Sequence, residues 1–159
     1  MGAPTAIDYT KMTANRVSYT LDSTLDSVNK VEHTAEELAA KIGFSEDDRH
    51  RIAMAVREAA VNAVLHGNAY DPDKRVHLSL EQNGREMIVT IADEGKGLEP
   101  EEIPDPLAPE NLMKQSGRGI FLIRAFMDEV RFRKLEPGTE ITLIKRVPGT
   151  ERDRQEAST

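Results

Sequence analysis

Three short polar segments contain most of the residues in this chain that could do chemistry. They are Glu58–Gly67, Asp93–Gly97 and Gly117–Gly119, in this order along the sequence. The first offers a carboxylate and a carboxamide one helical turn apart, and the other two offer glycines that let the backbone approach a ligand closely. Each segment alone is weakly specific, but their order and setting together predict an ATP site.

The first segment lies in a stretch that is apolar at eleven of the fourteen positions from 52 to 65. Such a pattern predicts a helix that is buried on nearly all sides. Glu58, Asn62 and His66 follow one another at intervals of four residues and therefore form one stripe along this helix. Because an unpaired buried carboxylate is costly, we interpret the stripe as the wall of a cavity that holds a metal ion and phosphates.

Each side chain of this stripe has a functional and a structural interpretation. Asn62 offers a neutral oxygen to Mg²⁺, which prefers oxygen ligands, and Glu58 is placed to position or deprotonate an attacking hydroxyl or water. The alternative is that Glu58 pairs with a nearby arginine and that Asn62 caps a backbone group. We interpret His66, at the end of the helix, as a partner of the helix dipole rather than as a ligand.

The second segment follows directly on an apolar strand expected at 86–92. At the end of a strand, Asp93 can accept a hydrogen bond from an exocyclic amine such as that of adenine. Gly95 and Gly97 let the backbone approach the ring and take a positive φ. The alternative is a plain turn with an exposed aspartate.

The third segment precedes the apolar helical stretch Ile120–Phe126. Gly117 and Gly119 expose N–H groups at the N-terminus of this helix, where the helix dipole favours a phosphate. Arg118 can add a charge-assisted contact; the alternative is an ordinary helix start with Arg118 in solvent. The sequence contains no P-loop signature and no HRD or DFG motif, which excludes two other common phosphate-binding schemes.

Periodicity and turn signals around these segments predict alternating strands and helices. Capping boxes and hairpin turns are expected at Ser23 with Asp26, at Ser45 with Asp48, at Asn83-Gly84 and at Pro137-Gly138. The expected strands are 16–21, 76–82, 86–92, 129–135 and 139–147, and the expected helices are 23–41, 45–66 and 120–126.

The rest of the chain is divided by composition. Residues 1–15 are expected to form a flexible arm, 16–147 the folded domain and 148–159 a disordered tail. The segment 98–116 holds four prolines and is long for a loop of a compact domain, so we interpret it as a lid.

Bulk composition excludes several classes of function. The net charge of −7 argues against nucleic acid as the main partner, because phosphate backbones favour a basic face. The absence of cysteine removes disulfides, thiolate metal sites and cysteine nucleophiles. No apolar run approaches the ~20 residues of a membrane span, and no signal peptide is visible, so we expect a cytoplasmic protein.

In order, the three segments resemble the N, G1 and G2 boxes of the GHKL (Bergerat-fold) ATPases. This superfamily includes gyrase, the MutL repair protein, a heat-shock chaperone and histidine kinases, and the resemblance is closest to the anti-sigma-factor serine/threonine kinases. Residues 57–68 and 116–123 carry the likeness to that branch, together with 137–143 as the last box. The resemblance covers residues 17–146.

The resemblance implies an α/β two-layer sandwich, with helices on one face of a mixed, mostly antiparallel sheet, and Mg·ATP as the ligand. It implies these roles: Glu58 as catalytic base, Asn62 as Mg²⁺ ligand, Asp93 as adenine reader with Gly97 and Thr139 beside the adenine, Gly117 and Gly119 as phosphate cradle, and 98–116 as ATP lid. Some of these kinases carry an arginine where this chain has Gln115. Lys114 and Arg118 are therefore the candidates to contact the γ-phosphate.

The resemblance also implies partners. The substrate would be a serine or threonine of a STAS-domain anti-anti-sigma protein, and a homodimer would bind a sigma factor. An ATP-dependent anti-sigma module with little or no kinase activity stays open, although Glu58 favours the kinase because binding alone needs no base. A histidine kinase domain is disfavoured because no helical pair with a phosphoacceptor histidine precedes it, and a gyrase-type or chaperone-type ATPase because those chains are much longer.

Overall fold

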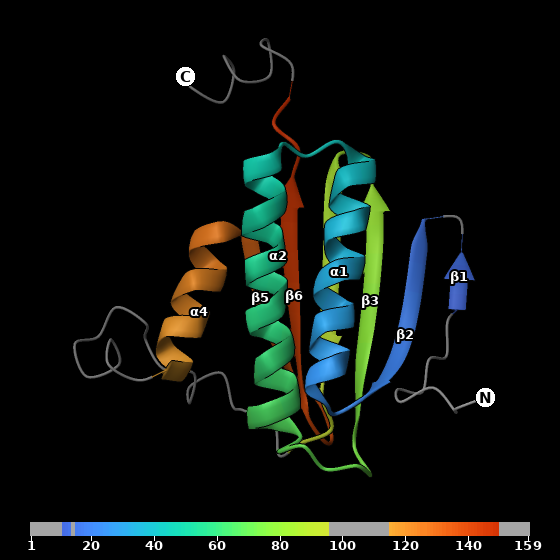
Figure 1. The fold of residues 1–159 in the computed structure, drawn as a ribbon, viewed down its shortest axis with the longest axis vertical. Coiled ribbons are helices and arrows are strands. Elements are labelled where there is room, and N and C mark those ends of the chain that lie inside the picture. The colour runs from blue at the N-terminus through green and yellow to red at the C-terminus, as the bar shows by residue number, and fades with distance from the viewer. Residues whose placement is uncertain (1–10, 14, 96–114, 150–159) are drawn as a thin grey trace.

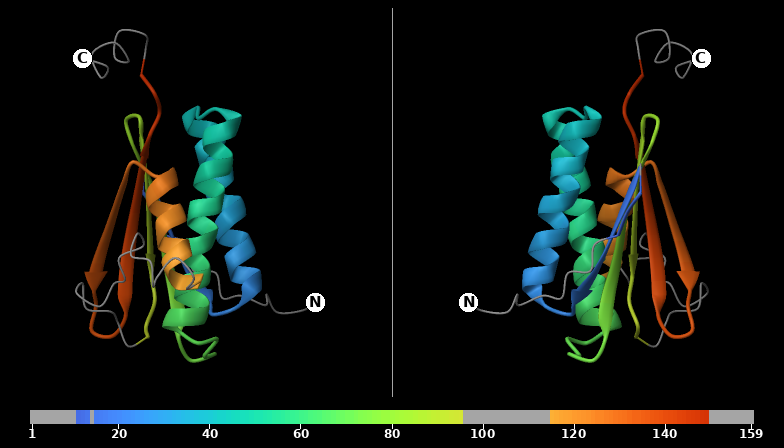
Figure 2. Two further views of the ribbon diagram at one scale, coloured as in Figure 1. Left: turned by 90° about the vertical axis from the view of Figure 1, so that its left-hand side faces the viewer. Right: turned by 90° about the vertical axis from the view of Figure 1, so that its right-hand side faces the viewer.

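The computed structural model, which describes residues 11–13, 15–95 and 115–149, has helices packed on one face of a β-sheet (Figure 1). The strands of this part of the chain are β1 (Lys11–Thr13), β2 (Arg16–Asp22), β3 (Arg75–Asn83), β4 (Glu86–Ala92), β5 (Glu129–Lys134) and β6 (Thr139–Arg146). The helices are α1 (Leu25–Ile42), α2 (Glu46–Val61), the π-helix η1 (Asn62–Gly67) and α4 (Gln115–Phe126). All of these helices lie on the same side of the sheet (Figure 2), which confirms the predicted two-layer α/β sandwich.

The strand order of the sheet is β1-β2-β3-β4-β6-β5. Every neighbouring pair among these strands is antiparallel, so the expected antiparallel majority is confirmed and no parallel pair occurs among them. Leu78 lies opposite Ile91 and Leu80 opposite Val89, and all four side chains are at most 2% exposed. Because side chains alternate across a strand, this apolar face meets the helices and forms the core.

Helix α1 begins one residue later than the sequence predicts. Thr24, and not Ser23, is its N-cap, since the Thr24 hydroxyl accepts a hydrogen bond from the N–H of Ser27 at 3.2 Å. Ser23 is buried, and its hydroxyl donates to the carbonyl of Lys74 at 2.5 Å, so the predicted capping role of Ser23 is wrong. At the other end, Gly43 has φ 108° and ends the helix in the left-handed conformation, as expected.

Helix α2 starts where the sequence predicts, because the hydroxyl of Ser45 accepts a hydrogen bond from the N–H of Asp48 at 3.2 Å. It lies between α1 and α4 (Figure 1). Its outer side is not buried, since Met54 is 48% exposed, and in the η1 segment that follows it Leu65 is 37% exposed. The expectation of a helix buried on nearly all sides is therefore wrong, because a sheet and two flanking helices enclose only part of its circumference.

The helical hydrogen-bond pattern widens after α2. In η1 the bonds span five residues instead of four, so that the N–H of Asn68 donates to the carbonyl of Ala63 at 2.8 Å. The chain then turns through Ala69 and Tyr70, whose φ angles of 51° and 57° are uncommon outside glycine. The predicted end of the helix at Gly67 is confirmed, but its last turn is not α-helical.

Strand β1 lies inside residues 1–15, which the sequence predicts as an arm without regular structure. It pairs with β2 in an antiparallel manner, with Met12 opposite Val17. Three residues are too few to show the alternation that predicts a strand, and only pairing with a longer neighbour reveals it. Residues 98–114 of the expected lid and residues 150–159 of the expected tail lie outside the described residues.

Candidate nucleotide site

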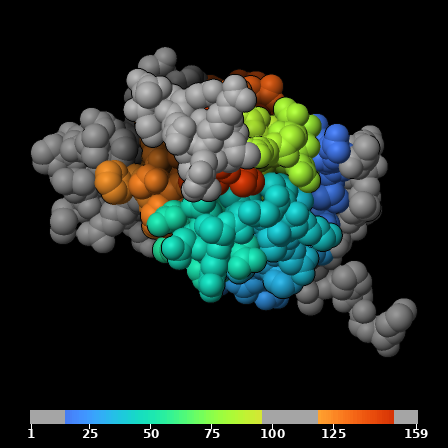
Figure 3. All heavy atoms as spheres, turned by 90° about the horizontal axis from the view of Figure 1, so that it is seen from above, coloured from blue at the N-terminus to red at the C-terminus, as the bar shows by residue number. Residues whose placement is uncertain are grey.

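The described segments that carry predicted site residues meet at one end of the sheet, the lower end in Figure 1, where β4 ends and β6 begins. The opposite end, viewed directly in Figure 3, is formed by the corner between α1 and α2 and by the β3–β4 hairpin. The end of η1 and the start of α4 also lie at the lower end. Segments that are far apart in the sequence therefore converge on one place.

Asp93, directly after β4, is only 7% exposed. Its N–H donates to the carbonyl of Thr139 at 3.0 Å. Its Oδ1 accepts hydrogen bonds from the N–H groups of Gly95 at 3.0 Å and of Thr139 at 3.2 Å. The alternative of an exposed aspartate in a plain turn is therefore wrong. Both hydrogen bonds that the described residues donate to this carboxylate go to Oδ1, which leaves Oδ2 as an acceptor for a ligand.

Three glycines allow other chain segments to close around Asp93. A Cβ atom on Gly67 would overlap the carboxylate of Asp93, and one on Gly138 would overlap its carbonyl oxygen. A Cβ atom on Gly95 would overlap the carbonyl oxygen of Gly67. Gly138 also has φ 111°, whereas Gly95 does not have a positive φ. The expected positive φ at Gly95 is thus wrong, because close approach is what requires glycine there; Gly97 lies outside the described residues.

Burial raises the pKa of the Asp93 carboxyl above its ordinary value of 3.8, although the hydrogen bonds from the N–H groups of Gly95 and Thr139 act in the opposite direction. The ionised form is thus destabilised by desolvation. A ligand that donates a hydrogen bond to Oδ2 would offset part of that cost. An amine of a nucleobase is such a donor.

Glu94, the next residue, behaves differently. Burial opposes its ionisation too, but hydrogen bonds from His77 and from the N–H of Arg75 outweigh that effect, so the pKa of Glu94 lies below its usual 4.5. Its two carboxylate oxygens are 2.9 Å from Nε2 of His77 and 2.8 Å from the N–H of Arg75. Glu94 therefore joins the segment after β4 to the start of β3.

Asn68 is a site residue that the sequence did not single out, although it closes the segment 57–68. It is fully buried, and its side-chain oxygen accepts a hydrogen bond from the N–H of Glu94 at 2.7 Å. No local pattern reveals this contact, because its partner is 26 residues away. The one available signal was an asparagine directly after the glycine that ends the helix.

The second part of the site lies between α2 and α4. Glu58 and Asn62 are half-buried, and Gly119 of α4 faces them both. A Cβ atom on Gly119 would lie 3.1 Å from Oε2 of Glu58 and 3.8 Å from Nδ2 of Asn62. The structure therefore brings the first and third predicted segments together, and a Cβ atom at position 119 would sit in tight contact with the carboxylate of Glu58.

The structural alternatives for Glu58 and Asn62 find no support in the part of the chain that the structure describes. The neighbouring Arg57 is directed to α1 instead, where its guanidinium is 2.8 Å from Glu32 and 2.9 Å from Asn29. Neither the Glu58 nor the Asn62 side chain takes a hydrogen bond from a described residue. These two side chains are thus available to a ligand.

His66 does not continue the stripe. It lies in η1, where the wider turn shifts it relative to Glu58 and Asn62, and it is exposed whereas they are half-buried. The interpretation of His66 as a non-ligand agrees with this position. Helix α4 begins at Gln115, two residues before the predicted glycine pair, so Gly117 lies in its first turn and Gly119 is its fifth residue. The expected exposure of the Gly119 N–H at the helix N-terminus is therefore wrong, because that N–H is bonded within the helix. Lys114 lies outside the described residues.

The donor set suits Mg²⁺ held mainly by a nucleotide. No cluster of three or more potential metal-binding side chains occurs among residues 11–13, 15–95 and 115–149. Mg²⁺ commonly keeps several waters and takes one or two protein oxygens together with substrate phosphates. The amide oxygen of Asn62 fits that need without further protein ligands.

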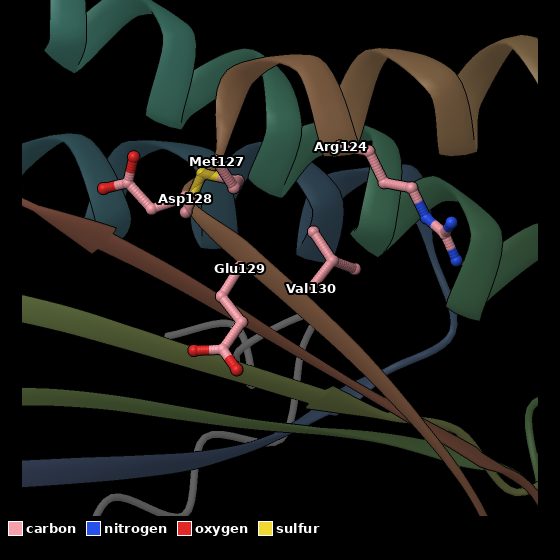
Figure 4. A pocket seen from close by; sticks show the side chains of 5 residues that line it. All are labelled: Arg124, Met127, Asp128, Glu129 and Val130. Carbon is pink, nitrogen blue, oxygen red and sulfur yellow. The ribbon is translucent and has the colours of Figure 1, made fainter.

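A hollow of about 260 Å³ lies where α4 joins β5 (Figure 4). It is lined by Arg124, Met127, Asp128, Glu129 and Val130. Asp128 is engaged in the fold, because its carboxylate accepts a hydrogen bond from the N–H of Arg146 at 2.7 Å. The hollow lies at the C-terminal end of α4, away from Gly119, so we assign it to the joint between helix and sheet and not to the nucleotide site.

Comparison with known proteins agrees with this geometry. A family model described as a histidine kinase-like ATPase domain matches residues 21–145, which include the converging segments. The chain therefore belongs to the histidine kinase-like (GHKL) ATPases. None of the helices in the described ranges is long and apolar enough to cross a membrane.

The relatives place the chain in one branch of this family. It is 37% identical over 117 residues to an anti-sigma F factor of Anoxybacillus flavithermus, with 70% of this chain and 79% of that protein covered. It is 30% identical over 142 residues to the serine-protein kinase RsbW of Staphylococcus epidermidis, with 84% and 87% covered. The branch is that of the anti-sigma factor kinases, as the sequence predicted.

Solved structures show the same fold. The RsbU and RsbW domains of Rv1364c from Mycobacterium tuberculosis match with a TM-score of 0.58 at 25% identity; the match covers 86% of this chain but only 33% of that longer one. The catalytic domain of histidine kinase ThkA matches with a TM-score of 0.53 at 16% identity, with 77% of this chain and 92% of that chain covered. The second likeness concerns the fold alone.

Proposed function

We propose that this chain is a cytoplasmic ATP-dependent serine/threonine kinase and anti-sigma factor of a partner-switching system. In this proposal it phosphorylates a serine or threonine of a STAS-domain anti-anti-sigma protein and, as a homodimer, sequesters a sigma factor. The names of the relatives, anti-sigma F factor and serine-protein kinase, support the class of activity and of partner. The geometry of the site supports the chemistry.

The approach of Gly119 to Glu58 and Asn62 is the observation that carries the proposal. It places a carboxylate beside the start of α4, where N–H groups of a helix N-terminus favour phosphates. A carboxylate repels phosphate, so its presence there needs a reason. General-base catalysis supplies one, since an attacking hydroxyl must lose its proton close to the γ-phosphate.

Each part of the proposed site then has a task. Oδ2 of Asp93 accepts a hydrogen bond from the adenine amine, with Gly95, Gly97 and Thr139 beside the ring. Asn62 offers its oxygen to Mg²⁺, which neutralises phosphate charge when it is bound.

The remaining residues act at the phosphates. The free N–H groups in the first turn of α4, that of Gly117 among them, cradle the phosphates. Gly119 allows Glu58 and Asn62 to come close to this helix. Lys114 and Arg118 are the charged partners proposed for the γ-phosphate. Glu58 takes the proton of the partner's hydroxyl as the hydroxyl oxygen bonds to the γ-phosphorus and the bond to the ADP oxygen breaks. The products are a phosphoserine or phosphothreonine and ADP.

A transfer assay with γ-labelled ATP, Mg²⁺ and STAS-domain proteins of the source cell tests this proposal. We expect label on one serine or threonine of a STAS partner, identified by mapping the phosphorylated peptide. A pull-down from the native cell with and without Mg·ATP provides the candidates. Failure of the purified chain to bind ATP would overturn the proposal as a whole.

The same assay separates the second candidate function. ATP binding and sigma-factor capture without any transfer of label would favour an ATP-binding anti-sigma module with little or no kinase activity. Glu58 argues against that outcome, because capture of a partner does not require a base beside the phosphates.

A further inference from the structure

The fully buried Asn68 connects four segments of the chain. Its Nδ2 donates hydrogen bonds to the hydroxyl of Ser23 and to the carbonyl of Arg75, each at 2.9 Å. Its Oδ1 accepts from the N–H of Glu94 at 2.7 Å. One side chain thus ties the end of η1 to the corner between β2 and α1, to the start of β3 and to the residue that follows Asp93.

The contact with Glu94 is the one that reaches the nucleotide site. The N–H of Glu94 belongs to the peptide unit that joins it to Asp93, and a peptide unit is planar. A hydrogen bond to that N–H therefore restricts the rotation of the backbone on the C-terminal side of Asp93. On the N-terminal side, the N–H of Asp93 is held by the carbonyl of Thr139 at 3.0 Å. The backbone of Asp93 is thus held from both sides.

The carboxylate direction depends on this backbone. Oδ1 of Asp93 already receives the N–H groups of Gly95 and Thr139, so Oδ2 can face a ligand only if the Asp93–Gly95 turn keeps its shape. Of the hydrogen bonds described for that turn, the one that the N–H of Glu94 donates to Asn68 is the only one that reaches the segment 57–68, which carries Glu58 and Asn62.

We propose that Asn68 is a positioning residue, which aims Oδ2 of Asp93 at the amine of the nucleobase through its hydrogen bond to Glu94. The inference rests on the proposed function, because only a site that reads adenine needs a carboxylate held in this direction. Its consequence is specific to the base. Guanine presents a carbonyl oxygen where adenine presents an amine, so an acceptor that is aimed correctly favours ATP over GTP.

This consequence distinguishes positioning from a purely structural role. A residue that only stabilises the fold would, when replaced, weaken ATP and GTP alike, because both share the ribose and the triphosphate. Loss of Asn68 as a positioning residue should instead weaken ATP more than GTP. The ratio of the two dissociation constants is therefore the quantity to measure.

The experiment compares Asn68→Ala with the wild-type chain by calorimetric titration of Mg·ATP and Mg·GTP. We expect the preference for ATP over GTP to fall about tenfold, the effect of one misdirected hydrogen bond. Val31→Ala is the matched control: it removes apolar bulk from a side chain of α1 that is 1% exposed, so it should destabilise the fold and leave the preference unchanged.

An unchanged preference in folded Asn68→Ala would overturn the inference. If that variant does not fold, amide hydrogen exchange of the wild-type chain decides: the N–H of Glu94 should exchange slowly, and more slowly with ATP than with GTP. Equal exchange with both nucleotides would also overturn it. A wild-type chain with no preference for ATP, or one that keeps its preference in Asp93→Asn, would instead contradict the proposed function.

Discussion

The adenine end and the phosphate end of the candidate site are built in different ways. At the adenine end, Asp93 is fixed by backbone groups of Gly95 and Thr139, and a glycine allows each close approach. At the phosphate end, Glu58 and Asn62 project from a helix, and no described residue donates a hydrogen bond to either side chain. One end is fixed before a ligand arrives, and the other offers side chains that a ligand can engage.

This difference assigns the choice of nucleobase to the adenine end and the transfer of phosphate to the phosphate end. A rigid acceptor discriminates between bases because it cannot adapt to the wrong one. The phosphates and their cation can in turn complete the contacts of the other end. Variants of Asp93 and of the glycines packed on it should therefore change both ATP affinity and stability, whereas loss of the base Glu58 at the phosphate end should change the rate alone.

Glu58→Gln should give the largest effect. Removing a general base lowers the rate of phosphate transfer by roughly 10²–10⁴-fold, while ATP affinity and the urea midpoint stay close to those of the wild type. Initial rates with labelled ATP and the STAS partner measure the loss. Glu32→Gln is the control, because Glu32 of α1 pairs with Arg57 of α2 and lies outside the proposed site. A similar rate for both variants would remove Glu58 as the base.

Gly138→Ala should give the next largest effect, at the adenine end. Gly138 and Gly43 have nearly equal φ angles of 111° and 108°, but a Cβ atom meets the backbone of Asp93 only at Gly138 and open space at Gly43. Gly43→Ala should therefore cost only the left-handed strain, roughly 1–2 kcal/mol. Gly138→Ala should lose more than that and should bind ATP less tightly. Urea unfolding and ATP titration of both variants test this, and equal losses in stability would contradict the close packing.

Asp93→Asn should weaken ATP by about 10- to 100-fold, because the amide offers a donor where the adenine amine needs an acceptor. Stability should change in the opposite direction. Since the folded-state pKa of Asp93 is raised, the wild type loses stability as the pH rises from 3.8 through that pKa, and the variant does not. Urea unfolding over this range should show the variant gaining relative to the wild type, and native ATP affinity would rule out the adenine role.

Glu94→Gln should give the smallest effect. The pKa of Glu94 is lowered, so its charge contributes stability above pH 4.5 that is lost as the pH falls through the folded-state pKa. The pair with His77 is partly exposed, so the loss at neutral pH should stay below about 1 kcal/mol. ATP affinity should not change, because only the backbone of Glu94 borders the reading carboxylate. A tenfold weaker affinity of Glu94→Gln for ATP would show that the Glu94 side chain also belongs to the rigid adenine end of the site.

Local chemistry explains what the sequence could predict. The Pro137-Gly138 turn, the Ser45 cap and the Gly43 end each depend on residues that are close in the chain, and all three occur in the structure. The hairpin predicted at Asn83-Gly84 also occurs, but its turn residues are Gly84 and Arg85, because Asn83 is the last residue of β3 and lies opposite Glu86. The convergence of Glu58, Asn62 and Gly119 was predicted from the order of the segments. The roles of Gly97 and Lys114 stay predictions.

Contacts between distant residues explain what the sequence could not predict. Ser23 looks like a helix cap, but its hydroxyl is engaged with Lys74, which lies 51 residues away. Asn68 looks like the end of a helix, but its partner is Glu94. Met54 belongs to an apolar stretch, but the residues of that stretch do not show which face of α2 the neighbouring helices leave exposed to solvent.

The length of the π-helix η1, which follows α2, determines where the residues on either side of it lie. Each hydrogen-bonded turn of the π-helix contains one residue more than a turn of an α-helix, and Asn68 follows directly on its last residue. Deleting one residue between Asn62 and Asn68 would let the π-helix tighten into an α-helix. It would also move the buried side chain of Asn68 away from its three hydrogen-bond partners. The π-helix thus acts as a spacer that sets the distance between the adenine end and the phosphate end of the site. A sequence alignment shifted by one position here would assign the wrong residues to both ends.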